Sequence, residues 1–323
     1  MKYSKIFLVL FSIALGSCKD DLIQPEVLSN MDRVSAWRGQ SYFTDIPSIV
    51  FEARSNAVVA SNDSLVFIIG SGLMGDQTSY EMWQYFPRES KMKPTYRNVP
   101  ESVVGAIGFM LKGECYYGLG YAASGFRNSI YVNRFGNWSG IATFPGNARS
   151  GSVAFVINNK AYVGLGSSGT FYQDLYEYNP ITQSWRKMTN FPGVGRSDAC
   201  AFVLNGKAYV GTGYDGSHYL NDFYEFNPTT NQWIQIDNLP GVERDDAVAF
   251  AFEKRGYVGT GWNNIVGVLS DMYEFNAQTG SWREAPKFSN TGRLAAVAFT
   301  YNGKAYVGTG NNAVDLKDFW VSK

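Results

Sequence analysis

The sequence predicts an all-β protein, a six-bladed β-propeller built from four-stranded blades. A Gly-x-Gly motif recurs at intervals of 46 to 49 residues, with its first glycine at Gly70, Gly118, Gly164, Gly211, Gly259 and Gly308. A tryptophan precedes the last four of these glycines by 26 residues each time, at Trp138, Trp185, Trp233 and Trp282. Such self-similarity at a fixed period is typical of repeat architectures in which each unit is one supersecondary element.

Each unit is expected to contain four strands. In the fourth unit, two β-rich runs flank Asn205-Gly206, a dipeptide that favours the tight turn of a β-hairpin. The aromatic run at 221–226 and the run at 233–240 follow, separated by the turn residues 227–232. Apolar residues do not follow helical spacing, so we expect no helices in the repeats. Six such sheets in series protect their edges when they close into a propeller.

Closure of the ring is predicted to use the N-terminal part of the propeller. The last unit ends at Lys323 without a fourth, tryptophan-bearing strand. The segment around Trp37 is similar to the fourth-strand sequence at 184–192. Residues near 35–46 are therefore expected to complete the sixth blade, which places the propeller at residues 35–323.

These units resemble the kelch repeat, whose period is about 50 residues. The shared features are a strand ending in glycines, as in "AYVGTG", a downstream Tyr or Phe, a later Trp, and an Arg before the next inner strand. The usual adjacent Gly-Gly is Gly-x-Gly in this chain. The resemblance implies the propeller fold, which by itself does not define a function.

The N-terminus predicts export and lipidation. Residues 1–17 contain Lys2, Lys5 and a short apolar run, a pattern typical of a secretory signal peptide. The segment "LGSC" ending at Cys18 resembles the lipobox of bacterial lipoproteins, which implies that Cys18 is lipidated. We therefore expect a cell-envelope lipoprotein, anchored in the outer membrane and surface-exposed, with residues 18–34 as a tether. The alternative is a secreted protein without an anchor.

Composition limits the function. Lys+Arg and Asp+Glu are equal at 28 each, so no basic surplus favours nucleic acid as a partner. His218 is the single histidine, and we expect it at the surface. Cys115 and Cys200 are expected to be buried free thiols. No metal or cofactor is expected, and the copper ligands that galactose oxidase requires are missing.

Candidate ligand-binding residues come from two positions of the repeat. An Arg precedes the inner strand in five units, and we expect these arginines around one mouth of the central channel. The loops that follow the Gly-x-Gly motifs emerge on the same face and supply aromatic and amide side chains. The predicted ligand-binding residues are Arg54, Arg149, Arg196, Arg244, Arg293, Tyr121, Tyr214, Trp262 and Asn311. The alternative is that the arginines hydrogen-bond neighbouring loops, as arginines at this place in kelch repeats often do.

Two functions remain open. The first is a non-catalytic binding module that recognises a glycan or a protein on the loop face. The second follows from similarity to kelch-fold sialic acid mutarotases, sugar-modifying enzymes that need no metal. In that case Asp198 or Asp246 would transfer protons, and Arg196 or Arg244 would hold a substrate carboxylate. The sequence favours the binding module as the expectation.

Overall fold

The structure of the chain is a computed structural model. It describes residues 43–45, 54–70, 72–73, 77–78, 80–86, 89, 91–95 and 98–322, and the propeller lies within a compact unit of residues 41–323. The signal peptide, Cys18, the tether and Trp37 fall outside the described residues. Among the residues that are described, none forms a helix, and so no helix there is suited to crossing a membrane.

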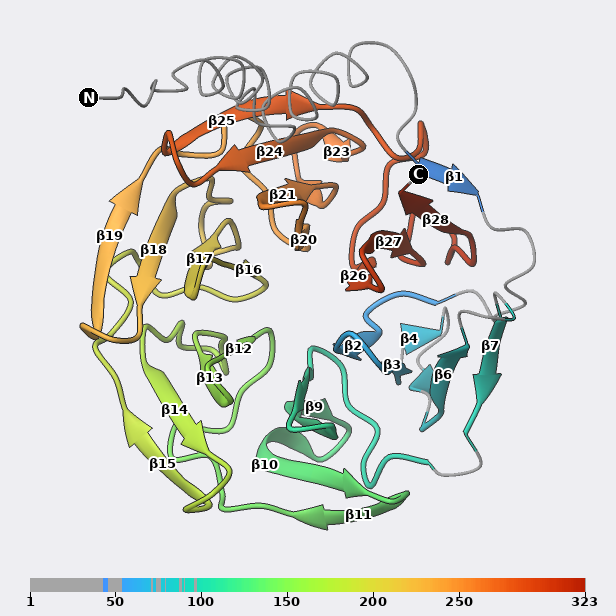
Figure 1. Ribbon diagram of the computed structural model, residues 1–323, viewed down its shortest axis with the longest axis vertical. Helices are drawn as coiled ribbons and strands as arrows, with labels where there is room; N and C mark the ends of the chain where they lie inside the picture. The colour runs from blue at the N-terminus through green and yellow to red at the C-terminus, as the bar shows by residue number, and fades with distance from the viewer. Residues whose placement is uncertain are drawn as a thin grey trace, which may run out of the picture. The chain divides into compact units, whose positions relative to one another are not determined.

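Six four-stranded antiparallel sheets are arranged around a centre, as the repeat predicted (Figure 1). Blade 1 consists of β2 (Val58–Ser61), β3 (Val66–Ile69), β6 (Met82–Phe86) and β7 (Lys91–Pro94). Blade 2 consists of β8 (Ile107–Leu111), β9 (Glu114–Ala122), β10 (Gly125–Arg134) and β11 (Asn137–Gly140). Blade 3 consists of β12 (Val153–Ile157), β13 (Lys160–Gly164), β14 (Leu175–Asn179) and β15 (Ser184–Lys187).

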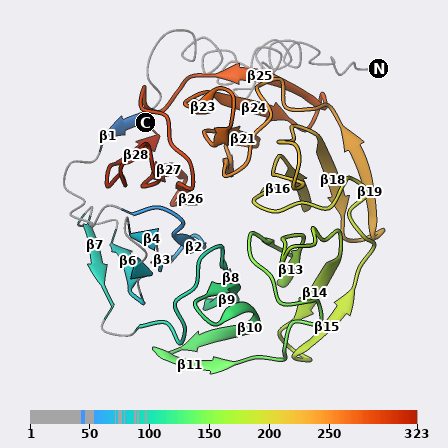
Figure 2. The same cartoon turned by 180° about the vertical axis from the view of Figure 1, so that it is seen from behind.

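The second half of the ring repeats this order. Blade 4 consists of β16 (Cys200–Leu204), β17 (Lys207–Gly211), β18 (Phe223–Asn227) and β19 (Gln232–Ile236). Blade 5 consists of β20 (Val248–Phe252), β21 (Arg255–Gly259), β24 (Met272–Asn276) and β25 (Ser281–Ala285). Blade 6 combines β26 (Val297–Tyr301), β27 (Lys304–Gly308) and β28 (Phe319–Ser322) with β1 (Phe43–Asp45). The first strand of each blade lies nearest the centre, as seen for β2, β12, β16, β20 and β26 in Figure 1 and for β8 in Figure 2.

Two short hairpins extend the loops that follow the second strands of blades 1 and 5. They are formed by β4 (Gly72–Leu73) with β5 (Gln77–Thr78), and by β22 (Trp262–Asn263) with β23 (Gly267–Val268). Trp262, expected in an irregular loop, therefore begins a strand.

The sixth blade is closed by an N-terminal strand, which confirms the prediction of closure. β1 pairs antiparallel with β28, with Thr44 opposite Val321. The paired residues fall at the C-terminal end of the predicted 35–46 segment. Strands more than 270 residues apart in sequence thus share one sheet. Because β1 pairs with β28, blade 6 has four strands like the other blades, and β28 is not left as an unpaired edge.

The Gly-x-Gly motif has a steric cause at each glycine. A Cβ on Gly164 would lie 2.2 Å from the carbonyl oxygen of Asp174, so the first glycine permits close approach of the third strand. The second glycine adopts a positive φ, +86° at Gly166 and +99° at Gly213, which disfavours any other residue. Both glycines are therefore required where the second strand turns into the mouth loop.

The repeated tryptophans connect successive blades. The indole Nε1 of Trp185 donates to the carbonyl oxygen of Ala142 at 2.8 Å, and that of Trp282 donates to Asp237 at 2.9 Å. In both cases the acceptor lies after the fourth strand of the preceding blade. The rings of Trp185, Trp233 and Trp282 also pack on an aromatic residue of their own third strand, as in Trp185 on Tyr178 at 4.9 Å, whereas Trp138 lies opposite Asn133. These contacts fix the angle between neighbouring sheets.

Candidate active site at the channel mouth

The five repeated arginines do not face the channel mouth. All five side chains have no exposed surface, which contradicts the expected exposure of Arg54, Arg149, Arg196, Arg244 and Arg293. Each guanidinium donates instead to an acidic side chain and to a backbone carbonyl within its own blade. Because a side chain without exposed surface cannot reach a ligand at the mouth, we leave the arginines out of the candidate site.

Arg196 illustrates the pairing. Its two terminal nitrogens bond the carboxylate of Asp222 at 2.5 and 2.9 Å, and one of them also donates to the carbonyl oxygen of Thr212 at 3.0 Å. The forked geometry suits a planar guanidinium. The same pairs join Arg149 to Asp174, Arg244 to Asp271 and Arg293 to Asp318, and Arg54 reaches Glu81 at 3.5 Å. The alternative of a structural arginine thus describes the geometry.

A ring of six residues narrows the channel at this mouth. Each lies two residues after the arginine position and has a positive φ between 50° and 64°: Asn56, Gly105, Gly151, Asp198, Asp246 and Ala295. Backbone hydrogen bonds connect neighbours in the ring, for example from Asp198 N to Gly151 O at 2.9 Å and from Asp246 N to Asp198 O at 3.2 Å. The left-handed backbone turns these positions toward the axis, so their side chains surround the opening.

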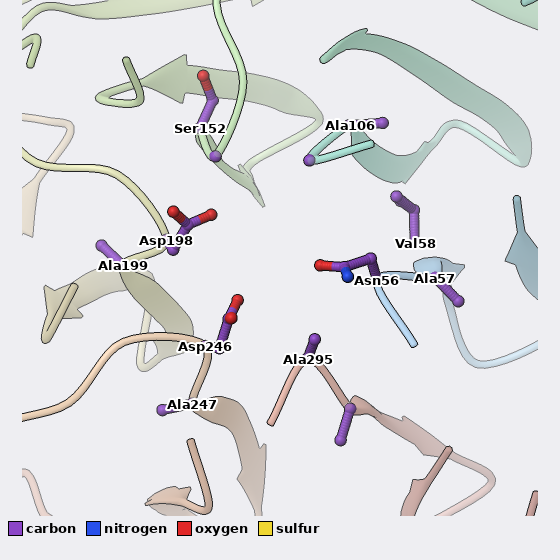
Figure 3. Close-up of a pocket in the computed structure, with 13 residues that line it drawn as sticks. Asn56, Ala57, Val58, Ala106, Ser152, Asp198, Ala199, Asp246, Ala247 and Ala295 are labelled. Carbon is purple, nitrogen blue, oxygen red and sulfur yellow. The ribbon is translucent and has the colours of Figure 1, made fainter. Parts of the chain in front are cut away.

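Polar side chains lie on opposite sides of this ring, with one amide across the opening from two carboxyl groups. Figure 3 shows the amide of Asn56 and the carboxyl groups of Asp198 and Asp246 around the open centre. The ring encloses a cavity of about 150 Å³. Further down the channel the walls are apolar, formed by alanines and valines such as Ala201, Ala249 and Val297. The aspartates therefore stand at the boundary between the open face and a hydrophobic channel.

This environment raises the pKa of the aspartates. Burial raises the pKa of Asp198, against a hydrogen bond from Ser197 that lowers it. Burial, followed by the negative charges of Asp198 and Asp245, holds the pKa of Asp246 well above its usual range. Burial and the charge of Asp198 raise the pKa of Asp245 to about 7. Asp245 Oδ1 is buried without a hydrogen-bond partner among the described residues, in keeping with this shift.

Aromatic residues form a wall beside the aspartates. Tyr214 pairs through its backbone with Ser197, and Trp262 pairs with Asp245, so each is held next to an aspartate of the ring. Tyr219 lies between them, 5.1 Å from the ring of Tyr214 and 5.3 Å from that of Trp262. Tyr214 and Trp262, two of the predicted residues, are therefore connected through Tyr219, which sequence reasoning missed.

The remaining predicted residues have different surroundings. Tyr121 is half exposed and contacts Phe126 at 4.9 Å, across the mouth from the aromatic wall. The amide of Asn311 donates to Asp315 at 2.9 Å within its own loop. His218 is exposed, and Cys115 and Cys200 are buried free thiols, as expected.

The mouth pocket has the dimensions of a small-molecule site. It occupies about 410 Å³ and is lined by Tyr121, Phe126, Asn56, Asp198 and Asp246, together with backbone of the neighbouring loops. Ligand pockets commonly occupy about 300–1,000 Å³. The described residues contain no group of three His, Cys, Asp or Glu arranged to hold a metal ion.

A larger groove lies between blades 1 and 2. Cavities of about 580 and 520 Å³ share Phe67, Gln84, Asn133 and Gly136 as lining residues. Asn133 occupies the third-strand position where blade 4 places Phe226 against Trp233, so a ring is missing here. The groove brings together no pair of carboxyl groups. We therefore place the candidate active site at the mouth, where the perturbed aspartates lie.

The fold and its repeated pairs define the class: the chain is a six-bladed β-propeller, and one of its blades matches the kelch motif. A family model described as the kelch motif matches residues 195–240, which contain blade 4. The solved structure of YjhT superposes with a TM-score of 0.72 over 85% of this chain and 96% of that chain, at 15% identity. This likeness extends the agreement in fold to the whole ring.

Curated relatives add a functional comparison. The chain is 32% identical over 95 residues to the N-acetylneuraminate epimerase of Salmonella typhi, which is 27% of this chain and 25% of that protein. It is 35% identical over 91 residues to the N-acetylneuraminate epimerase of Pasteurella multocida, 26% of this chain and 24% of the relative. The chain thus matches about a quarter of the length of these relatives. Their names overturn the expectation of a non-catalytic binding module and favour the enzymatic alternative.

Proposed function

We propose that the protein is a sugar epimerase or mutarotase whose acid and base are Asp246 and Asp198. The observation that carries the proposal is the pair of carboxyl groups, with raised pKa values, at the floor of a pocket walled by aromatic rings. The similarity to N-acetylneuraminate epimerases supports the reaction class. Two groups whose surroundings separate their pKa values are suited to acid and base roles.

Burial raises the pKa of both aspartates, and they differ in the further groups that act on each carboxyl. Asp198 receives a hydrogen bond from Ser197 that favours its ionised form, so it would be the base. Asp246 is kept protonated by burial and by two neighbouring carboxylates, so it would be the acid. Asp245 does not line the pocket, and its charge would act by maintaining the proton on Asp246.

A balanced reaction can be written with these groups. Asp198 accepts the proton of the anomeric hydroxyl while Asp246 donates a proton to the ring oxygen. The bond between the anomeric carbon and the ring oxygen breaks, and the carbonyl of the open-chain sugar forms. Rotation of that carbonyl and the reverse proton transfers close the ring with the other configuration. The sugar is neither oxidised nor reduced, and both carboxyl groups return to their starting states.

The test is anomer exchange measured by NMR on the purified protein with N-acetylneuraminate, N-acetylmannosamine and glucose. The wild-type protein should accelerate exchange of at least one sugar over buffer. Asp198→Asn and Asp246→Asn should each reduce that acceleration about 10²–10⁴-fold, the usual contribution of general acid–base catalysis. Asp237→Asn, at an exposed site beyond β19, is the matched control. Exchange equal to buffer for every sugar, or full activity in both mouth variants, would reject the proposal.

A further inference from the structure

Among the residues that the structure describes, no basic side chain lines the mouth pocket to receive an acidic ligand. The arginines next to the ring are buried and already paired with carboxylates of their own blades. Among the described residues that line the pocket and the ring, the acidic groups are Asp198 and Asp246, and none is Lys, Arg or His. Asp245 adds a third carboxyl group beside them.

Other nearby cations are also engaged. Arg127 follows the mouth loop of blade 2, where it pairs with Glu101 and donates to the carbonyl oxygen of Gly125 at 2.8 Å. His218 points to solvent from the blade 4 loop, with 77% of its side chain exposed, and lies 3.5 Å from Asp215. A ligand carboxylate in the pocket would therefore meet like charge without a compensating cation.

We propose that the pocket takes a non-acidic sugar, one that is neutral or carries an amino group. This inference rests on the proposed function and narrows its substrate class. Hydroxyl or ammonium hydrogens would donate to Asp198 and Asp246, and Asn56 can both donate and accept at the opposite side of the opening. The apolar face of the sugar ring would pack on Tyr219 and Trp262. N-acetylneuraminate, the sugar in the relatives' names, carries a carboxylate and is a poor match for this charge pattern.

A matched pair of ligands isolates the effect of charge. N-acetylneuraminate and its methyl ester share the same ring and differ in the negative charge. Binding of each is measured by calorimetry at pH 7.5 and low salt, after treatment of the protein with EDTA, alongside N-acetylmannosamine and glucosamine. We expect the ester to bind at least tenfold more tightly than the acid. We also expect at least one of the two non-acidic sugars to bind more tightly than the acid.

The aspartates should be the cause of this discrimination. Asp198→Asn keeps the shape and removes the ionised carboxylate, so it should reduce the ratio of ester to acid affinity, whereas Asp237→Asn should leave the ratio unchanged. Equal or tighter binding of the acid overturns the inference, and if the acid also undergoes exchange the proposed function stands. Tighter binding of the non-acidic ligands without exchange of any sugar supports the inference and rejects the function. Absence of binding by all four ligands overturns the inference.

Discussion

Asp245→Asn should stabilise the protein at alkaline pH and leave its stability unchanged at acid pH. The pKa of Asp245 is raised to about 7 by burial and by the charge of Asp198. A carboxyl group whose pKa is higher in the folded than in the unfolded state binds its proton more tightly in the folded state. Its favourable contribution is therefore present at low pH and is lost as the pH rises from about 4 to about 7. Asparagine has no such titration.

The size of the effect follows from the shift in pKa. A rise of about three units from the usual value near 3.9 corresponds to about 4 kcal/mol if the group were fully buried. The side chain of Asp245 retains partial exposure, and solvent screening reduces the figure to roughly 1–2 kcal/mol. For a domain of this size, each kcal/mol shifts the melting temperature by about 2–4 °C. The variant should therefore melt roughly 2–8 °C above the wild type at pH 8.

Thermal melting monitored by circular dichroism at pH 4 and pH 8 makes the comparison. The difference between variant and wild type should grow with pH. Asp237→Asn, which removes an exposed carboxylate, should show the same small difference at both values. A variant that is equally stabilised at pH 4 and pH 8 would show that the gain does not come from the titration of Asp245. A variant that is destabilised at pH 8 would show that its carboxylate is paired and not strained.

Three further outcomes test other parts of the structure. Arg196→Met should lower the free energy of unfolding by about 3 kcal/mol, measured by chemical denaturation, because Asp222 loses its partner. Replacing Asp222 by Leu in addition should restore part of that loss. Unchanged stability together with loss of sugar exchange would return Arg196 to the candidate site. Trp262→Ala should cost about 1 kcal/mol or less but weaken sugar binding in calorimetry, whereas Phe226→Ala, in the core, should cost about 3–5 kcal/mol. Asn133→Tyr should raise the melting temperature by filling the groove between blades 1 and 2, and a lower value would show that the groove cannot close around a ring.

The fold could be predicted from the sequence because the residues under the strongest steric constraints recur with a fixed period. Gly164 and Gly166 recur with their equivalents because a strand crossing and a positive φ exclude side chains at these places. The sequence predicted the position of the closing strand less closely than it predicted the repeats. The similarity around Trp37 placed it by side-chain pattern, whereas the pairing of Thr44 with Val321 depends on where the sixth blade leaves its free edge.

The orientation of the arginines was not accessible from spacing alone. Their place before each inner strand is compatible with an exposed ring at the mouth and with a buried ring between strands. The deciding partner is the aspartate before the third strand, about 25 residues later, as in Arg293 with Asp318. The signal that could have found it is internal: blade 2, which has Val103 in place of the arginine, has Ser129 where blades 3 to 6 have this aspartate and blade 1 has Glu81.

Comparison of equivalent positions in the six blades also distinguishes structural residues from candidate site residues. A residue that recurs from blade to blade has the same structural role in each, and the role that the blades share is to pack and join strands. Arg244 and Asp271 belong to this kind, and their charges are neutralised within blade 5. At the ring position the blades differ: Asp198 and Asp246 stand where others have Gly105, Gly151 or Ala295. Two carboxyl groups lie on adjacent blades, whereas the other blades have neutral residues at this position, so the mouth is not symmetric. A sugar is itself asymmetric, and a mouth without symmetry can bind it in a single orientation.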